Sequence, residues 1–246
     1  MRQLALALAL GLVLSGCADD PAAGSDEVVV LGAASMAEVL EDLADLYEQE
    51  HPGARVVLST GGSSGLARQV VNGLPADLLV LASPGSLQPV LDAGEQREEP
   101  VVVARNRIEI AVREGNPKRL SGLADLARPE LAVALCASQV PCGAAADRAL
   151  QQAGVTASPD TLEQDVRAVL TKVRLGEVDA GVVYATDVRA ADDEVDGLPV
   201  EPPVTTDYPA VRLRGGSAPD AAQDLLDLLR SERGQALLVE AGFEVP

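Results

Sequence analysis

Four times in this chain, a turn made of small, hydroxyl-bearing or polar residues leads directly into a helix pattern. Three of these turns follow an apolar strand pattern, at residues 32–35, 59–65 and 140–143, and the fourth ends at Asp165. The first turn of a helix leaves backbone N–H groups without partners and carries the positive end of the helix dipole, about half a charge. Several helix starts that face one cleft would bind an anion without any basic side chain.

Apolar strand patterns alternate with amphipathic helix patterns along most of the chain. We expect strands at residues 28–31, 55–58, 77–81, 101–103, 108–112, 131–135, 180–184 and 210–213, and helices at 36–50, 65–72, 86–93, 143–153, 166–175 and 218–229. Buried-type strands between amphipathic helices are typical of α/β units around a largely parallel sheet. The sequence therefore predicts an α/β protein built from two such sets.

The composition narrows the classes of partner. Hydrophobic residues make up 47% of the chain, which indicates a globular protein, whereas aromatic residues make up only 2% and offer no stacking platform. The formal net charge of −19 argues against nucleic acid or an anionic membrane surface, because both require clustered Lys and Arg. A small anion is not excluded, since local dipoles act on it more strongly than distant, screened charges.

The N-terminus has the pattern of an export signal. A basic Arg2 precedes an uninterrupted apolar run at residues 4–14, which is too short to span a membrane permanently. The run ends in Leu-Ser-Gly-Cys at 14–17, which resembles the bacterial lipobox, where the chain is cut before the cysteine and a lipid is attached to it. We therefore expect a signal peptide over 1–16 and lipidation of Cys17. An ordinary signal peptide with a chance cysteine is the alternative.

Two further cysteines, Cys136 and Cys142, lie six residues apart across a predicted loop. In an exported protein such a pair is a candidate disulfide, and two buried free thiols are the alternative. A metal site does not fit the pair, because His51 is the only histidine and no other thiol is near in the sequence.

The segment Gly-Gly-Ser-Ser-Gly at 61–65 matches the G-x-S-x-G nucleophile elbow of serine hydrolases, with Ser63 at its centre. That chemistry needs a histidine, which in this fold follows the serine, and His51 precedes Ser63 inside a His-Pro-Gly turn. The other interpretation is that the glycines let the backbone approach a ligand while the serines donate hydrogen bonds.

Three other positions combine a structural and a binding interpretation. Ser35 and Glu38 fit the S-x-x-E capping box, and the same turn would also present the Ser35 hydroxyl to an anion. Asp165 is placed to cap a helix that begins at Val166. Tyr184 ends a predicted strand, where it either faces a cleft or packs in the core.

Taken in order, these features resemble the bacterial molybdate-binding proteins of ABC importers. The resemblance lies in seven blocks spread over roughly residues 27–246, at 33–35, 62–69, 75–77, 140–143, 165–167, 182–184 and 208–211. It implies the type II periplasmic-binding-protein fold, with two α/β lobes, a hinge near 101–112 and 208–213, and an oxyanion between the lobes. The implied first lobe comprises 27–104 and 209–246, the second comprises 105–208, and residues 17–26 form a linker after the anchor.

The resemblance also implies a set of oxyanion-binding residues. Ser35 and Ser63 would each give a hydroxyl and a backbone N–H from the first lobe, Cys142 and Val166 would give backbone N–H groups from the second, and Tyr184 would give its phenol. All are neutral donors, which suits a fully deprotonated tetrahedral dianion, because a site without acceptors rejects hydrogenphosphate. One departure is Cys142 itself, since the family usually carries alanine there and an acidic residue near position 136.

The implied protein is a monomeric, extracytoplasmic receptor that captures molybdate and tungstate and delivers the anion to an ABC permease. It would catalyse no reaction and need no cofactor, and Cys17 would anchor it to the outer face of the cytoplasmic membrane. The alternatives are a receptor for another tetrahedral oxyanion such as sulfate, or a serine hydrolase that uses Ser63.

Overall fold

The computed structural model describes residues 27–191 and 193–246. The strands are β1 (Glu27–Ala33), β2 (Arg55–Gly61), β3 (Leu78–Val80), β4 (Val101–Arg113), β5 (Val133–Cys136), β6 (Thr161–Glu163), β7 (Ala180–Tyr184), β8 (Val195–Pro199) and β9 (Thr205–Arg212). The α-helices are α1 (Ala37–Glu50), α2 (Ser63–Val71), α3 (Pro84–Asp92), α4 (Pro141–Ala153), α5 (Val166–Arg174), α6 (Ala185–Ala190), α7 (Pro219–Arg230) and α8 (Glu232–Glu240). Short 3-10 helices occupy Ala34–Met36 and Leu123–Ala127. The predicted α/β class is confirmed.

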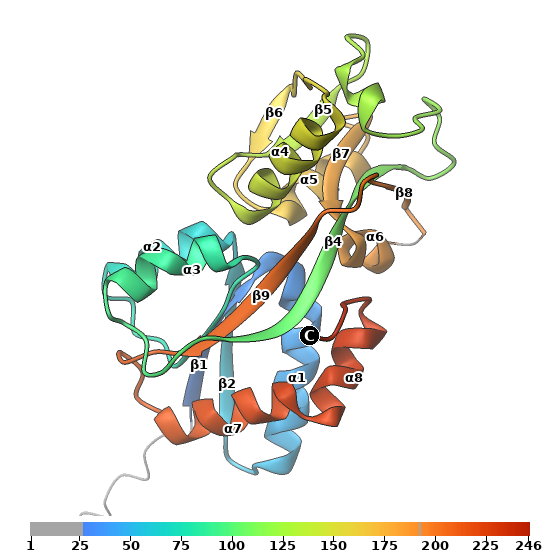
Figure 1. Cartoon of the computed structure of the whole chain (residues 1–246). Helices are drawn as coiled ribbons and strands as arrows, with labels where there is room; N and C mark the ends of the chain where they lie inside the picture. Colours follow the sequence, from blue (N-terminus) through green and yellow to red (C-terminus); the bar gives the residue numbers. More distant parts are fainter. Residues whose placement is uncertain (1–26, 192) are drawn as a thin grey trace, which may run out of the picture.

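The elements form two lobes joined by long strands (Figure 1). In the first lobe the strand order is β2-β1-β3-β9-β4, with α1, α2, α3, α7 and α8 around the sheet. In the second lobe β4 continues into the order β4-β7-β5-β6, with β8 paired to β4 and with α4, α5 and α6 alongside. The described strands thus belong to one continuous hydrogen-bonded path that passes through both lobes.

Strand β1 shows why helices cover both faces of the first lobe's sheet. Successive side chains of a strand point to opposite faces. Val28 and Val30 join the apolar cluster that includes residues of α1, whereas Leu31 joins a separate cluster with Leu66 of α2 and Leu87 of α3. Because both faces are buried, the strand is apolar along its length rather than alternating.

Parallel strands end at the edge of each lobe where helices begin. In the first lobe β1 pairs in parallel with β2 and β3, and in the second lobe β5 pairs in parallel with β6 and β7. Their carboxyl ends therefore lie together, and the turns that follow them lead into α1, α2, α4, α5 and α6. In α/β sheets this edge is where ligands bind.

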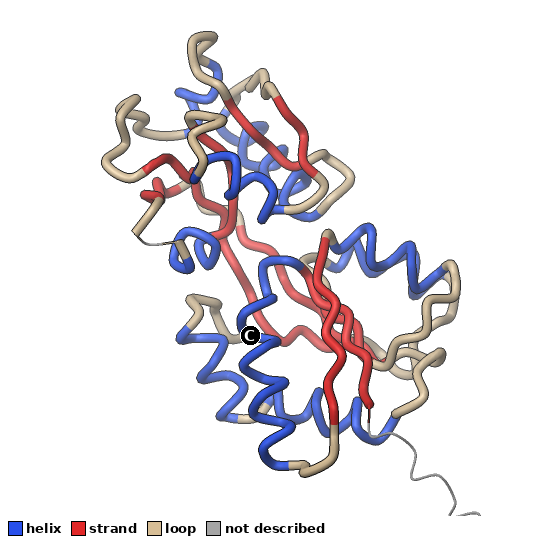
Figure 2. The backbone as a smooth tube through the Cα atoms, turned by 180° about the vertical axis from the view of Figure 1, so that it is seen from behind, coloured by secondary structure: helices blue, strands red, loops and turns tan. Residues whose placement is uncertain are grey.

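Strands β4 and β9 connect the lobes. The first half of β4 pairs with β9, and its second half pairs with β7 and β8. Figure 2 shows from behind how strands pass between the two lobes. The sequence predicts two separate strands here, at 101–103 and 108–112. That prediction is wrong, because the polar segment between them, which includes Asn106, stays paired with β9 after a register shift between Val102 and Ala104.

The structure corrects the sequence prediction in two further respects. The sheet is mixed rather than largely parallel, since β9 runs antiparallel to β3 and β4, and β4 runs antiparallel to β7 and β8. The short elements β6, β8, α6 and α8 were not predicted. Among the described residues, no helix is long and apolar enough to cross a membrane.

Candidate functional site: a small pocket between the lobes

A small pocket lies where the strand ends of the two lobes meet. The five residues expected to bind an oxyanion all line it: Ser35, Ser63, Cys142, Val166 and Tyr184. The space open to the centre of a water molecule measures about 20 Å³, little more than one water needs. A pocket of this size suits a compact ion.

Ser63 is fixed by its place at the start of α2. The helix begins at Ser63, with Gly62 as its N-cap residue, two residues before the predicted start at 65. The side chain is buried, and the backbone N–H of Ala82 donates to its Oγ over 3.0 Å. Because that bond occupies an acceptor position of the oxygen, the hydroxyl proton remains available to a ligand.

The structure gives Ser63 no catalytic base. The ring of His51, the only histidine of the chain, stacks on Tyr47 with centroids 4.2 Å apart. His51 lines a different pocket, at the far end of α1, together with residues of α7. A nucleophilic serine requires a base within hydrogen-bond reach, and His51 does not take that position beside Ser63.

Ser35 does not cap α1, so the capping-box prediction is wrong. It lies inside the 3-10 helix Ala34–Met36, and the N-cap residue of α1 is Met36, with no side-chain cap bond. Its Oγ instead lies 2.8 Å from the Oη of Tyr208 in β9, 173 positions later in the chain. A tertiary hydrogen bond has replaced the local one that the sequence pattern favoured.

Cys142 occupies the first turn of α4, and Cys136 ends β5. The two are joined by a disulfide with Cα atoms 5.7 Å apart. The turn between them is tightly packed, because a Cβ added to Gly143 would lie 2.1 Å from the carbonyl oxygen of Ala137. Helix geometry leaves the Cys142 amide without a partner in its own helix, and the disulfide ties that amide to the end of the strand.

Val166 is the first residue of α5. Asp165 is its N-cap, as predicted, and the Asp165 carboxylate accepts from the N–H of Ala168 over 2.9 Å. That cap leaves the Val166 amide without an intrahelical partner. Two helix starts of the second lobe, at Cys142 and Val166, therefore line the same pocket.

Tyr184 is buried, and its hydroxyl has no hydrogen-bond partner among the described residues. Its ring meets that of Tyr208 edge to face, with centroids 6.0 Å apart. Burial, with a smaller contribution from Tyr208, raises the pKa of Tyr184 well above its ordinary value. The phenol is therefore protonated, and it is a donor that still lacks an acceptor. A buried polar group without a partner is uncommon, so this hydroxyl is available to a ligand in the pocket.

Asp187 lies directly behind Tyr184. Its carboxylate is buried and accepts from the backbone N–H of Tyr184 over 2.8 Å. Burial raises the pKa of Asp187 from 3.8 to about 7, against the opposing effects of that hydrogen bond and of Arg167. The carboxyl holds the backbone of the strand end that carries the Tyr184 ring.

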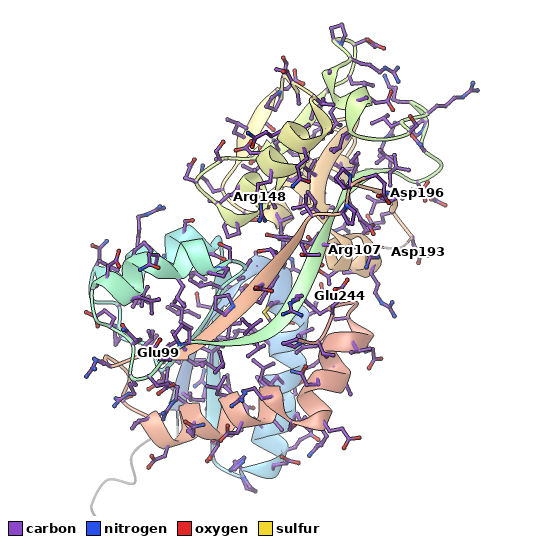
Figure 3. The ribbon with its side chains drawn as sticks, in the orientation of Figure 1. Glu99, Arg107, Arg148, Asp193, Asp196 and Glu244 are labelled. Atoms are coloured by element: carbon purple, nitrogen blue, oxygen red, sulfur yellow. A yellow bond between two sulfur atoms is a disulfide. The ribbon has the colours of Figure 1, made fainter. Side chains whose placement is uncertain are left out.

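Basic side chains do not line the pocket; Asp165 is the one charged residue among its lining, and its carboxylate is engaged as a helix cap. Arg167 pairs instead with Glu38 of α1 over 2.6 Å. Arg148 lies beside the crossing strands (Figure 3) and donates to the carbonyl of Thr205 over 3.3 Å. Any anion in the pocket would be held by helix starts and neutral donors.

The two lobes touch each other around the pocket, and the residues that make this contact are not among the five predicted site residues. A Cβ added to Gly62 of the first lobe would lie 2.3 Å from the carbonyl oxygen of Gln164 in the second. The Ser64 hydroxyl donates to the carbonyl of Gln139 over 2.7 Å. The glycine at position 62 can be recognised in the sequence, whereas only the tertiary structure shows that it faces Gln164 across the cleft.

Comparison with known proteins places this fold and pocket in a family. A family model for bacterial extracellular solute-binding proteins matches residues 28–244. The molybdate-binding protein ModA of Mycobacterium tuberculosis is 32% identical over 228 residues, which cover 92% of this chain and 87% of the relative. A putative ABC transporter substrate-binding lipoprotein, YvgL of Bacillus subtilis, is 25% identical over 247 residues, which cover 96% and 95%.

Among solved structures, the periplasmic molybdate-binding protein of Azotobacter vinelandii superposes with a TM-score of 0.74 at 21% identity, over 89% of this chain and 99% of that one. This likeness confirms the predicted periplasmic-binding-protein fold. The chain belongs to the bacterial extracellular solute-binding protein family.

Proposed function

We propose that this protein is an extracytoplasmic receptor that captures molybdate and delivers it to an ABC permease. Three observations support the proposal: the family, the identity to ModA over nearly the whole chain, and a pocket of neutral donors sized for a small ion. The last is the most specific, because a family match does not by itself select a ligand.

The observation that carries the proposal is the hydroxyl of Tyr184. It is buried, protonated, without a partner in the described structure, and part of the pocket lining. We propose that it donates to the bound oxyanion together with the hydroxyls of Ser35 and Ser63 and the amides of Cys142 and Val166. Hydrogen bonds to a charged group contribute about 1.5–3 kcal/mol each, so this set would bind a dianion without a basic side chain.

We further propose that the lobes close on the ligand by rotation about β4 and β9, with boundaries at 104/105 and 208/209. The support is the pairing of β4 with β9 in one lobe and with β7 and β8 in the other. Closure of this kind concentrates the conformational change in a few residues of the connecting strands. The ligand would then join donors that belong to different lobes.

Tungstate has the same charge and shape as molybdate and should bind as well, whereas sulfate is smaller and hydrogenphosphate needs an acceptor. We also propose that the protein catalyses no reaction. Ester hydrolysis is the specific activity to exclude, and chromogenic esters with Ser63→Ala as control would do so. Turnover that disappears in Ser63→Ala would contradict this part of the proposal.

The test of the proposed function is calorimetric titration of the domain 18–246 with molybdate, tungstate, sulfate and phosphate. We expect tight one-to-one binding of the first two anions and no heat from the others. Binding of sulfate alone would make the protein a receptor for a different oxyanion. Absence of binding by all four would contradict an oxyanion receptor.

We propose that Cys17 carries a lipid that anchors the protein to the outer face of the cytoplasmic membrane. Cys17, the signal segment 1–16 and the linker 17–26 lie outside the described residues, so the support comes from the lipobox-like sequence. Expression of the full chain and of Cys17→Ser, followed by membrane fractionation, tests the anchor. The native chain should sediment with membranes and the variant should not; equal membrane association would refute lipidation of Cys17.

A further inference from the structure

A chain of buried hydrogen bonds runs from the pocket into the strands that connect the lobes. The Oγ of Ser35 lies 2.8 Å from the Oη of Tyr208, whose side chain is fully buried. The Nδ2 of Asn106 in β4, also buried, donates to the same Oη over 3.4 Å and to the Oγ1 of Thr186 over 2.9 Å. The chain therefore links a predicted ligand-binding hydroxyl to both connecting strands and to the second lobe.

The orientation of the Asn106 amide follows from the backbone. The N–H of Arg107 donates to the Oδ1 of Asn106 over 3.0 Å, which fixes the amide so that its NH₂ group faces Thr186 and Tyr208. The Tyr208 oxygen thus accepts one bond from behind. Burial raises the pKa of Tyr208 above its ordinary value, so the phenol keeps its proton. The Ser35 oxygen, 2.8 Å from the Tyr208 oxygen, lies within reach of that proton.

We propose that Tyr208 and Asn106 are positioning residues that hold the Ser35 hydroxyl as a hydrogen-bond donor toward the ligand. The inference rests on the proposed function of Ser35. With its oxygen accepting from Tyr208, Ser35 directs its own proton into the pocket. The N–H of Ala82 acts on Ser63 in the same way. Both hydroxyls then present protons only, and the pocket disfavours any anion that carries a proton of its own.

A purely structural role for Tyr208 is the competing explanation. Its ring packs edge to face against Phe243 and Tyr184, with centroids 5.3 and 6.0 Å apart. Tyr208→Phe preserves this packing and removes only the hydroxyl. A structural hydroxyl would affect binding whether or not Ser35 is present, whereas a positioning hydroxyl acts only through Ser35.

The test is a double-mutant cycle of Tyr208→Phe and Ser35→Ala, read by calorimetry with whichever of molybdate, tungstate, sulfate and phosphate the native protein binds. We expect Tyr208→Phe to weaken binding about 3- to 10-fold in the native background, as for loss of one neutral hydrogen bond. In the Ser35→Ala background it should change affinity by less than about 2-fold. Equal losses in both backgrounds would overturn the proposal.

Anion selectivity provides the second measurement. If Tyr208 orients Ser35, its removal frees the Ser35 oxygen to accept, and the gap between molybdate and phosphate affinity narrows. Weaker molybdate binding with no gain in phosphate binding would instead indicate general damage and would contradict the proposal. Tyr47→Phe is the matched control, because it removes the one tyrosine hydroxyl outside the pocket and its hydrogen-bond chain. Since the cycle uses any anion that binds, failure of molybdate to bind would refute the proposed function without deciding the cycle.

A second variant tests the same proposal in case Tyr208→Phe does not fold. Asn106→Leu keeps the approximate side-chain volume and removes the donor to Tyr208 while leaving the phenol in place. We expect a smaller loss of affinity than for Tyr208→Phe, again dependent on Ser35. A loss that persists unchanged in the Ser35→Ala background would count against the chain of hydrogen bonds as the cause.

Discussion

The two lobes supply their halves of the pocket in different ways. In the first lobe the donors are serine hydroxyls, and each oxygen already has a protein partner. The N–H of Ala82 donates to Ser63, and the Ser35 oxygen lies 2.8 Å from the Tyr208 hydroxyl. In the second lobe the donors are helix-start amides and the hydroxyl of Tyr184, which has no partner in the described structure. The serine oxygens of the first half thus have protein partners before a ligand binds, whereas the Tyr184 hydroxyl would gain its partner from the ligand.

This difference predicts different consequences for stability and binding. Loss of a first-lobe hydroxyl leaves a buried donor unpaired in the protein itself, which lowers stability as well as affinity. Loss of the Tyr184 hydroxyl removes an unsatisfied group, so affinity falls while stability of the ligand-free protein does not. The pocket therefore contains two kinds of group. Some contribute to the stability of the ligand-free protein, and others contribute only to the binding free energy.

The largest effect is expected where the two halves touch. Gly62→Ala places a Cβ at 2.3 Å from the carbonyl oxygen of Gln164 and prevents close approach of the lobes. We expect an affinity loss of about 100-fold or more, comparable with a severe overpacking penalty. Calorimetry measures the loss, and thermal unfolding without ligand should change little because the lobes can separate.

Gly65→Ala is the matched control for this prediction. It lies in the first turn of α2, just after Gly62, and the nearest atom to an added Cβ is the end of the Arg68 side chain at 4.0 Å. The control should bind the anion normally. If both variants bound normally, contact of the lobes at Gly62 would have no part in ligand binding.

Next in size, Tyr184→Phe should weaken molybdate binding about 10- to 100-fold, the cost of one donor to a charged group. Its melting temperature without ligand should be equal to or above that of the native protein, because an unpaired buried hydroxyl is removed. Ser63→Ala should lower both affinity and melting temperature, since the Ala82 N–H loses its acceptor. If both variants changed affinity and melting temperature in the same way, the proposed difference between the two lobes would be wrong.

The buried carboxyl behind Tyr184 predicts a pH dependence of stability. The pKa of Asp187 is about 7 in the folded protein, against 3.8 ordinarily, so the folded state keeps a proton that the unfolded chain releases between about pH 4 and 7. Stability should fall as the pH rises through this window. Asp187→Asn retains an acceptor for the Tyr184 N–H and should be more stable than the native protein by about 1–3 kcal/mol at pH 8.

Denaturant unfolding of both proteins at pH 5 and pH 8 measures the Asp187 effect. The gain from Asp187→Asn should be smaller at pH 5, where the native carboxyl is protonated in the folded state. The same difference at both pH values would show that Asp187 does not titrate in this range.

The smallest effect on affinity is expected from the disulfide. Reduction of Cys136–Cys142 should lower the free energy of unfolding by about 2 kcal/mol, as for a short closed loop. Affinity should fall only a few-fold, because the Cys142 amide becomes less ordered but is not removed. Calorimetry on the reduced protein and on a Cys136→Ala/Cys142→Ala variant measures this. Loss of all binding would make the disulfide essential to the second half of the pocket.

Local signals predicted most of the helix starts and most strands. The glycine and serine turn before α2, the turn at 140–143 and the aspartate at 165 each indicate a helix start that the structure contains, although α4 begins at Pro141 rather than at the predicted 143. These signals act over a few residues, so a single sequence is enough to detect them. The five expected site residues also line one pocket.

The missed features depend on contacts that are distant in the sequence. Ser35 has a perfect local capping pattern, yet its hydroxyl bonds to Tyr208 because β9 passes beside β4 between the lobes. The polar segment around Asn106 has no apolar alternation, but pairing with β9 keeps it in the strand. The short edge strand β6 has too few residues for any pattern to be recognised.

The most direct test of this account is a crystal structure of the complex with molybdate, located by the anomalous scattering of its metal. We predict the anion within hydrogen-bond distance of the Ser35, Ser63 and Tyr184 hydroxyls and of the Cys142 and Val166 amides, with no basic side chain in contact. The alternative is that an arginine such as Arg167, which lines the neighbouring larger groove, binds the molybdate. That result would contradict the proposal that neutral donors from both lobes hold the dianion.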